Sequence, residues 1–229
     1  MTLLEEYLPE EGIIEPFQYR RFQFFALGDS KTDTLVQIQF RYPYFYDSSL
    51  IWINEKISSI AVNGMEPSIH RKNAAQSAAD IFDDYFLLLD DYPDYEFSWF
   101  LIRDIEKIYE DSSIATLLFR ESRYLGGAHP IDIRHFINLD KINHKELMLF
   151  DIISPDKEPN LTKYAEQIFR AVREIKFTGS LNAAGFWFNN DKFTLSENFS
   201  LADEGLVFYY NPYDIAPFSM GSTQLLLPI

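Results

Sequence analysis

The sequence predicts an α+β fold of mixed antiparallel sheets with about three helices. Apolar and polar residues alternate over residues 36–42, which is typical of a half-buried strand. Apolar residues recur at helical spacing over residues 72–90 and again over 160–176. The expected strands and helices come in groups rather than in regular strand–helix–strand alternation, which favours α+β over a parallel α/β fold.

The N-terminal half opens with residues 1–16, whose five Glu, two Pro and one Gly predict a loose leader. Strands are predicted at 17–27 and 36–42, with a turn at Gly28-Asp29-Ser30 and a strand end at Pro43. A helix is predicted through about Val62, with Ser48 or Ser49 as its cap and Asn63-Gly64 as its stop. A second helix over 72–90 places one stripe inward: Ala75, Ala78, Phe82, Tyr85, Phe86 and Leu89.

The second half is predicted to contain mostly strands around one further helix. Three strands are expected at 96–109, 113–124 and 131–139, followed by a short strand or turn at 147–153. The helix over 160–176 has Leu161, Ala165, Ile168, Val172 and Ile175 at helical spacing. The remaining strands are expected at 185–188, 193–200, 205–210 and 223–228.

Composition limits the classes of partner. The net charge is −15 over 229 residues, so nucleic acid and anionic membrane surfaces would be repelled and a cationic partner is favoured. The hydrophobic share of 47% and aromatic share of 17% provide enough apolar surface for one large domain or two small, tightly joined ones.

Cysteine usage, apolar runs and the N-terminus bear on the compartment. The chain has no cysteine, which removes disulfides, thiolate metal sites and cysteine nucleophiles. No apolar run approaches the roughly 20 residues that span a bilayer. Residues 1–11 show no signal-peptide pattern, so we expect either a cytoplasmic protein or one that starts after a removed export segment.

Acidic residues are segregated along the chain. Between Lys72 and Arg103 there is no basic residue, and the acids there are Asp80, Asp83, Asp84, Asp90, Asp91, Asp94 and Glu96. After Lys192 there is again no Lys or Arg, while Glu197, Asp203, Glu204 and Asp214 add four negative charges. Such tracts either steer a basic protein toward the surface or form a solvated face that aids solubility.

The sequence contains none of the short motifs that carry common chemistry. No G-x-S-x-G, G-x-x-x-x-G-K or G-x-G-x-x-G occurs. His129 and His135 are six residues apart in an extended run, roughly 20 Å, so they are not expected to share a metal ion. A glycosidase with two carboxylates stays open, because 35 acids offer many pairs. We expect no catalytic residue, no metal and no cofactor.

Two segments are candidate binding sites. Gly126 and Gly127 permit positive φ, and together with His129 they form either a rigid loop that presents an imidazole or a tight turn whose His bonds local backbone. The aromatic turn at 209–213, followed by Pro217, offers large contact area at low entropic cost. The alternative is that these aromatic residues only seal one end of the core.

These segments resemble those of the RsiV/PdaC-like family. The run YLGGAHP at 124–130, with FINLD at 136–140, is similar to one family segment. The tail GLVFYYNPYDIAPFSMG at 205–221 is similar to the family's C-terminal domain, and 36–44 with Ile53-Asn54 resembles its N-terminal half. The likeness covers roughly 17–229. Asp214 stands where the family usually has Glu, and Phe218 where it often has Tyr.

The resemblance implies bacterial extracytoplasmic envelope proteins, among them lipoproteins, a lysozyme-sensing anti-sigma factor and an accessory module of a peptidoglycan deacetylase. It implies halves at 17–139 and 140–229 and a non-catalytic binding or sensing role, with a cationic protein such as lysozyme, or peptidoglycan, as partner. The alternatives are a peptidoglycan-acting envelope enzyme and a structural lipoprotein domain. We predict one shared binding surface, formed by Gly126, Gly127, His129, Tyr213, Asp214 and Pro217.

Overall fold

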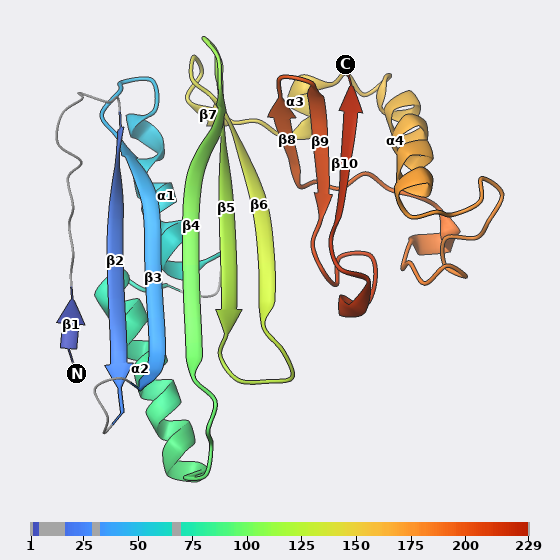
Figure 1. Cartoon of the computed structure of the whole chain (residues 1–229). Helices are drawn as coiled ribbons and strands as arrows, with labels where there is room; N and C mark the ends of the chain where they lie inside the picture. Colours follow the sequence, from blue (N-terminus) through green and yellow to red (C-terminus); the bar gives the residue numbers. More distant parts are fainter. Residues whose placement is uncertain (1, 5–16, 29–32, 66–69, 229) are drawn as a thin grey trace. The chain divides into compact units, whose positions relative to one another are not determined.

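The computed structural model describes residues 2–4, 17–28, 33–65 and 70–228 (Figure 1). The strands in these residues are β1 (Thr2–Leu4), β2 (Phe17–Leu27), β3 (Thr34–Phe45), β4 (Trp99–Glu110), β5 (Ile114–Tyr124), β6 (Ile131–Asp140), β7 (Lys145–Glu146), β8 (Phe199–Ala202), β9 (Gly205–Tyr210) and β10 (Thr223–Pro228). The helices are α1 (Asn54–Asn63), α2 (Ala74–Asp91), α3 (Leu149–Ile152) and α4 (Glu158–Val172), with 3-10 turns η1 (Ile51–Ile53), η2 (Asn189–Asp191) and η3 (Phe218–Met220).

The backbone forms two compact units. Unit 1 comprises Met1–Glu106 and Phe119–Asp132, and unit 2 comprises Lys107–Leu118 and Ile133–Ile229. Strands β1 to β7 follow one another in a seven-stranded sheet, and β10, β9 and β8 form a second sheet of three. The first sheet is mixed, because β2 and β3 are antiparallel whereas β3 and β4 are parallel. The predicted α+β class is therefore confirmed.

Unit 1 packs two helices on one face of its strands. The parallel pairing of β3 with β4 requires a crossover, and α1 and α2 supply it. Figure 1 shows both helices on the same side of β2 and β3. Val36, Ile38 and Phe40 alternate on that face and are at most 1% exposed, and Ala78 and Phe82 of α2 pack in the same core. The predicted alternation and the helix over 72–90 are confirmed.

A buried ion pair completes unit 1. Arg103 Nε donates to Glu121 Oε2 at 2.6 Å, and the two side chains are only 4% and 3% exposed. Arg103 Nη1 also donates to the backbone oxygens of Ala61 and Val62, at 3.3 and 2.5 Å, so the guanidinium satisfies carbonyls in the last turn of α1. Desolvation lowers the pKa of Arg103, against the opposing effect of Glu121. Gly64, with φ 77°, gives this guanidinium room and is the predicted helix stop.

Asparagine side chains bind neighbouring backbone in unit 2. Asn211 accepts from Arg134 N at 2.7 Å and donates to Arg134 O at 3.0 Å. Asn198 forms a similar pair with Phe136 N and Arg134 O, at 2.9 and 2.8 Å. These amides tie β6 to the segments that flank β8 and β9. The unit 2 core gathers on Phe169 of α4, which is fully buried and lies 4.8 Å from the ring of Phe186.

Several sequence expectations for unit 1 are wrong. Residues 2–4 form β1 rather than part of a loose leader, whereas residues 1, 5–16 and 29–30 lie outside the described residues. Strand β3 continues through Pro43 to Phe45; pairing with β4 ends at Arg41, so that neighbour needs no N–H from Pro43. Neither Ser48 nor Ser49 caps η1 or α1. Instead, Asp47 Oδ1 accepts from Ser49 N at 2.7 Å.

Other corrections fall in α2 and unit 2. Ala75 and Phe86 are exposed, so the inward stripe of α2 is narrower than predicted. Residues 147–153 contain the short helix α3, and the strand expected at 193–200 is reduced to β8. No strand forms at 185–188, where Phe186 and Phe188 alternate inward from extended backbone that joins no described strand. Helix α4 ends at Val172, because Glu174 takes φ 55°.

Candidate functional site

The two-glycine loop follows β5 within unit 1 and depends on its glycines. Gly126 has φ 83° and Gly127 φ 108°, conformations that disfavour side chains. A Cβ at Gly126 would lie 3.4 Å from the Trp99 ring, and one at Gly127 would meet no atom within 4 Å. Tyr124 OH donates to Gly127 O at 3.1 Å. His129 Nδ1 donates to Pro130 O at 2.8 Å, which favours the interpretation of a turn with a locally bonded His.

A groove lies beside this loop. It has a volume of about 470 Å³, and both glycines line it together with Leu125. The C-terminal half of α2 contributes Leu87 and Leu88. We call this site the α2 groove; all of its lining residues belong to unit 1.

Aromatic side chains form the floor of the α2 groove. Trp99 and Tyr95 both line it, and Trp99 Nε1 donates to Tyr95 OH at 3.0 Å. Tyr85 packs edge-on against Trp99 from the core, with ring centroids 5.3 Å apart. A hydrogen bond with Tyr95 raises the pKa of the Tyr124 hydroxyl. The indole and phenol are therefore held in fixed positions before any ligand arrives.

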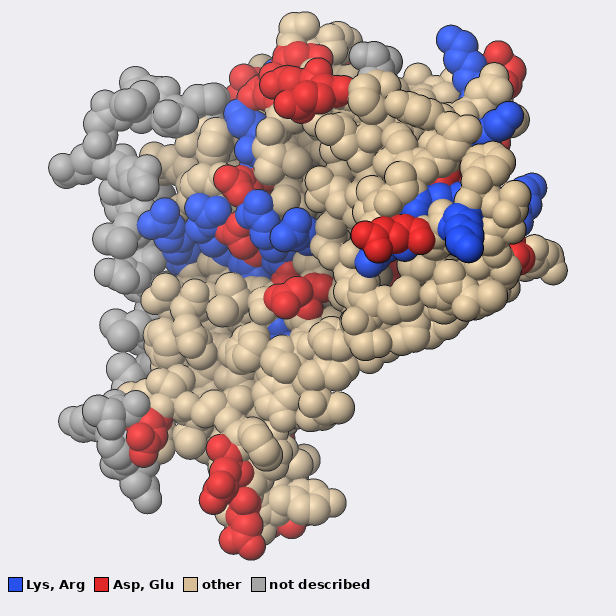
Figure 2. Space-filling view, turned by 45° about the vertical axis from the view of Figure 1, so that its right-hand side comes forward, with Lys and Arg blue, Asp and Glu red and all other residues tan. Residues whose placement is uncertain are grey.

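Carboxylates form the rim of the α2 groove. Asp84 and Asp91 both line it, seven residues apart on α2, which is about 10 Å along a helix. Asp83, Asp90, Asp94 and Glu96 are exposed on the same helix or just after it. Asp80, in contrast, pairs with Arg71 at 2.9 Å. Figure 2 shows red and no blue on the lower third of the drawn face, where Figure 1 draws the C-terminal turns of α2.

Apolar side chains are also exposed beside this acidic tract. Leu87, Tyr92 and Phe97 are 63%, 64% and 62% exposed. A large exposed apolar patch rimmed by polar residues is a known feature of interaction surfaces. The acidic tract predicted from the sequence and the glycine loop are thus brought together.

The second predicted segment lies in unit 2. Tyr213 adopts φ 73°, is 48% exposed and has its ring 5.8 Å from that of Phe218. Asp214 Oδ2 accepts from Asn211 N at 2.7 Å, and desolvation raises the pKa of Asp214 against that bond. Pro217 precedes η3, and the buried Ala216 lies between it and Ile215. Residues of this turn therefore already contact one another through a hydrogen bond and a ring contact.

The structure distributes the predicted site residues over the two units. Gly126, Gly127 and His129 belong to unit 1, and the glycines line the α2 groove. Tyr213, Asp214 and Pro217 belong to unit 2. The single shared surface therefore stays a prediction.

Sequence reasoning missed the groove residues Leu87, Tyr95 and Trp99. The run of three leucines at 87–89 was a signal that one leucine is exposed, because consecutive side chains point in different directions around a helix and cannot all face the core.

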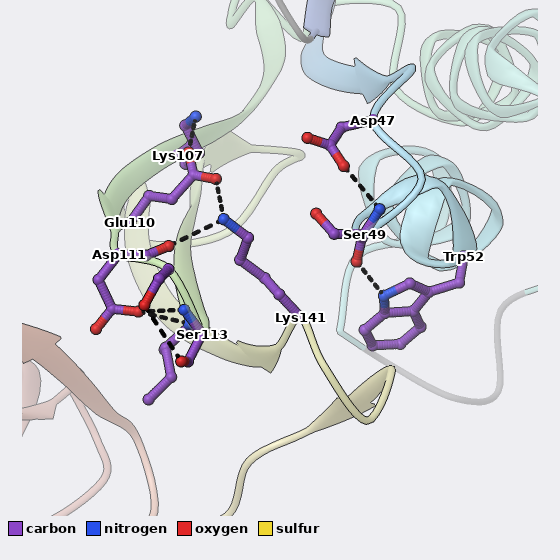
Figure 3. Close-up of polar contacts among 10 residues, drawn as sticks. Asp47, Ser49, Trp52, Lys107, Glu110, Asp111, Ser113 and Lys141 are labelled. Carbon is purple, nitrogen blue, oxygen red and sulfur yellow. Dashed lines mark hydrogen bonds and ion pairs between the residues drawn. The ribbon is translucent and has the colours of Figure 1, made fainter.

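The carboxylates of the β4–β5 hairpin in unit 2 already have partners. Figure 3 shows Lys141 Nζ donating to Glu110 Oε1, at 2.6 Å, and to the backbone oxygen of Asp111, at 2.9 Å. Lys107 pairs with the other Glu110 oxygen. Desolvation would raise the pKa of Glu110, but hydrogen bonds from the two lysines lower it overall. A general acid needs a raised pKa, so Glu110 is poorly suited to that role.

Two further observations bear on the class of site. Among the residues that the structure describes, no three His, Asp or Glu side chains are grouped so as to hold a metal ion. The described helices include none that is long and apolar enough to cross a membrane.

The fold defines an α+β protein of two units with solved structural relatives. A crystal structure of a DUF3298 family member from Bacteroides fragilis NCTC 9343 matches with a TM-score of 0.70 and 22% identity, over 93% of this chain and 89% of that one. A DUF3298 family protein from Pseudomonas aeruginosa PAO1 matches with a TM-score of 0.68 and 19% identity, over 95% and 93%. At these identities the likeness establishes the fold alone.

The sequence itself matches a family model over its last third. Residues 150–229 match the family described as "Protein of unknown function (DUF3298)". This segment contains the Tyr213–Pro217 turn but not the α2 groove. No curated protein matches the chain.

Proposed function

We propose that this chain is a non-catalytic binding or sensing module of the bacterial envelope that captures a cationic protein in the α2 groove. The observation that carries the proposal is that two aromatic side chains, an exposed leucine and two carboxylates line one groove. A Lys or Arg side chain suits such a site, because its methylene stem packs on apolar groups while its charge meets Asp84 or Asp91.

The apolar and acidic parts of the groove have separate tasks in this proposal. Burying a side chain such as Leu87 against a partner contributes about 1.5–3 kcal/mol, which lengthens the life of the complex. The acidic tract acts earlier, by attracting a positively charged protein over distances of about 10 Å at 0.1 M salt. Both contributions are needed for fast capture followed by slow release.

The resemblance to RsiV/PdaC-like proteins supports the choice of partner and compartment. It favours a lysozyme-like protein as the cationic ligand and an extracytoplasmic location. A shared surface that also includes His129, Tyr213 and Pro217 is part of this finer proposal, and Tyr213→Ala tests it: release should then accelerate at every salt concentration.

The non-catalytic role is supported by two carboxylates that are already engaged in ion pairs. Glu121 is buried in an ion pair with Arg103, and Glu110 is held by two lysines. A purified chain should not turn over peptidoglycan or chitooligosaccharides. Turnover that persists through repurification and disappears when one carboxylate is neutralised would overturn this part.

Binding is tested by surface plasmon resonance against hen-type lysozyme at low and high salt. Asp84→Asn/Asp91→Asn should slow association several-fold at low salt and much less at high salt. Leu87→Ala should accelerate dissociation about tenfold with little change in association. The matched control Asp203→Asn/Glu204→Gln removes the same charge from the β8–β9 turn in unit 2.

The control separates a local site from a general charge effect. If both double variants slow association equally, the groove is not the site. Absence of binding at micromolar lysozyme would remove that partner, and pulldown on purified peptidoglycan would then test the glycan alternative.

A further inference from the structure

A second cavity of unit 1 gathers positive charge, although the whole chain carries −15. It has a volume of about 490 Å³ and lies among α1, β2, β3 and the segment that enters α2. Three basic residues line it: Arg20, Arg71 and Lys72. We call it the α1 pocket. None of its lining residues lines the α2 groove, so it is a separate site.

The basic groups of the α1 pocket are held in place, and Arg71 is the one among them that pairs with a described carboxylate. The Arg20 guanidinium lies 3.8 Å from the centroid of the Tyr44 ring, which fixes its plane and leaves its N–H edges for a ligand. Arg71 Nε donates to Asp80 Oδ2 at 2.9 Å, which orients this second guanidinium. Within the described chain, no carboxylate pairs with Arg20 or Lys72.

Neutral donors supplement these charges. Ser58 and Ser59, on consecutive positions of α1, both line the pocket. Ser59 Oγ accepts from Asn63 Nδ2 at 3.3 Å, and its hydroxyl carries one hydrogen of its own. Ser58 Oγ lies 3.3 Å from Tyr42 OH, where either hydroxyl is able to donate.

We propose that the α1 pocket binds a phosphate group. Two guanidinium groups, an ammonium and two hydroxyls provide donors from several directions, which suits the oxygens of a tetrahedral anion better than the two oxygens of a carboxylate. Two carboxylates oppose anion binding: Glu55 lines the pocket, and Asp80 pairs with Arg71. The same chemistry is presented by free phosphate and by a phosphodiester.

The test is a titration of the ¹⁵N-labelled full chain with inorganic phosphate, followed by NMR at constant ionic strength. Saturable shifts are expected at the amides of Arg20, Ser58 and Ser59. Arg20→Gln/Lys72→Gln should weaken binding at least about tenfold, because each contact is a charge-assisted hydrogen bond. Dimethyl phosphate distinguishes a diester from the free anion, and acetate tests the carboxylate alternative.

Two single variants distinguish binding in the pocket from misfolding and from a general charge effect. Glu55→Gln should strengthen binding about threefold by removing a repulsive charge, a gain that misfolding does not produce. Lys56→Gln, on the same helix but outside the pocket lining, should leave the affinity unchanged. The proposal is overturned if shifts fail to saturate, if the double variant binds like the unmodified chain, or if acetate binds as tightly as phosphate.

Discussion

The two-glycine loop and the Tyr213–Pro217 turn are both predicted from the sequence as binding segments, yet they differ in how many of their polar groups are already hydrogen-bonded within their own unit. At Gly127 the structure leaves open space, and Gly126 borders a groove with fixed aromatic and acidic groups. At the turn, the Asn211 side chain accepts from Arg134 N, and the Asp214 carboxylate accepts from Asn211 N. Ile215 O accepts from Trp187 N at 2.7 Å. Polar groups in the turn therefore mainly stabilise unit 2.

This difference gives a general expectation for the two regions. Substitutions around the α2 groove should change binding more than stability, because its rim side chains are exposed and have few internal partners. Substitutions at Asn211, whose side chain bonds the Arg134 backbone within unit 2, should change stability more than binding. The predictions below break or sharpen that contrast, from the largest expected effect to the smallest.

The largest effect concerns the ion pair that supports unit 1. Glu121→Leu leaves Arg103 buried with its main charge partner gone, which should cost about 3 kcal/mol or more of unfolding free energy. Urea unfolding followed by tryptophan fluorescence measures the loss. Glu106→Gln is the matched control, because that carboxylate is 38% exposed and its pairing with Arg120 should contribute less than about 1 kcal/mol. Equal losses would mean that the buried pair matters no more to the stability of unit 1 than the exposed pair does.

The next effect tests the turn in unit 2. Asn211→Ala removes both hydrogen bonds to Arg134 and should cost about 1–3 kcal/mol. Asn189→Ala, at an exposed position, should stay within about 0.5 kcal/mol. Lysozyme affinity should be unchanged once the protein is folded. A variant that keeps its stability but loses binding would reverse the proposed roles of the two regions.

Sequence patterns predicted the parts of the fold that depend on periodic burial. The alternation in β3 and the inward residues Ala78, Phe82 and Tyr85 of α2 were sufficient to find their elements, because one face of each is apolar. They failed at Phe186 and Phe188, where alternation arises without a partner strand. They also missed α3, which is only one turn long.

The candidate site was predictable only in part. The glycines and the acidic tract are visible as local composition, so both were found. Their meeting in one groove depends on β4 placing Trp99 beside Gly126, a contact between residues 27 positions apart. The buried pair of Arg103 and Glu121 is likewise set by packing and is indistinguishable in sequence from surface charges.

Backbone conformation provides a smaller, matched comparison of the two regions. Gly126→Ala places a side chain at φ 83° and against Trp99, which should cost about 1–2 kcal/mol. Tyr213→Gly does the opposite at φ 73°. Relief there should offset the lost Phe218 contact, worth about 0.5–1.5 kcal/mol, so little net change is expected. Chemical unfolding of both variants decides; a larger loss for Tyr213→Gly would show that the aromatic contact dominates.

The smallest effect is the pH dependence of the turns in unit 2. Hydrogen bonds from the backbone N–H groups of Ser113 and Ile114 lower the pKa of Asp111 below its ordinary value. Because the pKa is lower in the folded state, this carboxylate stabilises the fold above its unfolded pKa of about 3.9. That contribution is lost as the pH falls through the lower, folded pKa.

Asp111→Asn should therefore be less stable than the unmodified chain at neutral pH. The difference should shrink as the pH falls below about 4 and vanish once Asp111 is protonated in both states. Thermal unfolding across that pH range measures it. Asp156→Asn, an exposed acid elsewhere in unit 2, serves as the control. A stability difference for Asp111→Asn that is constant with pH would mean that the amide fails to replace the contacts for steric reasons rather than through loss of charge.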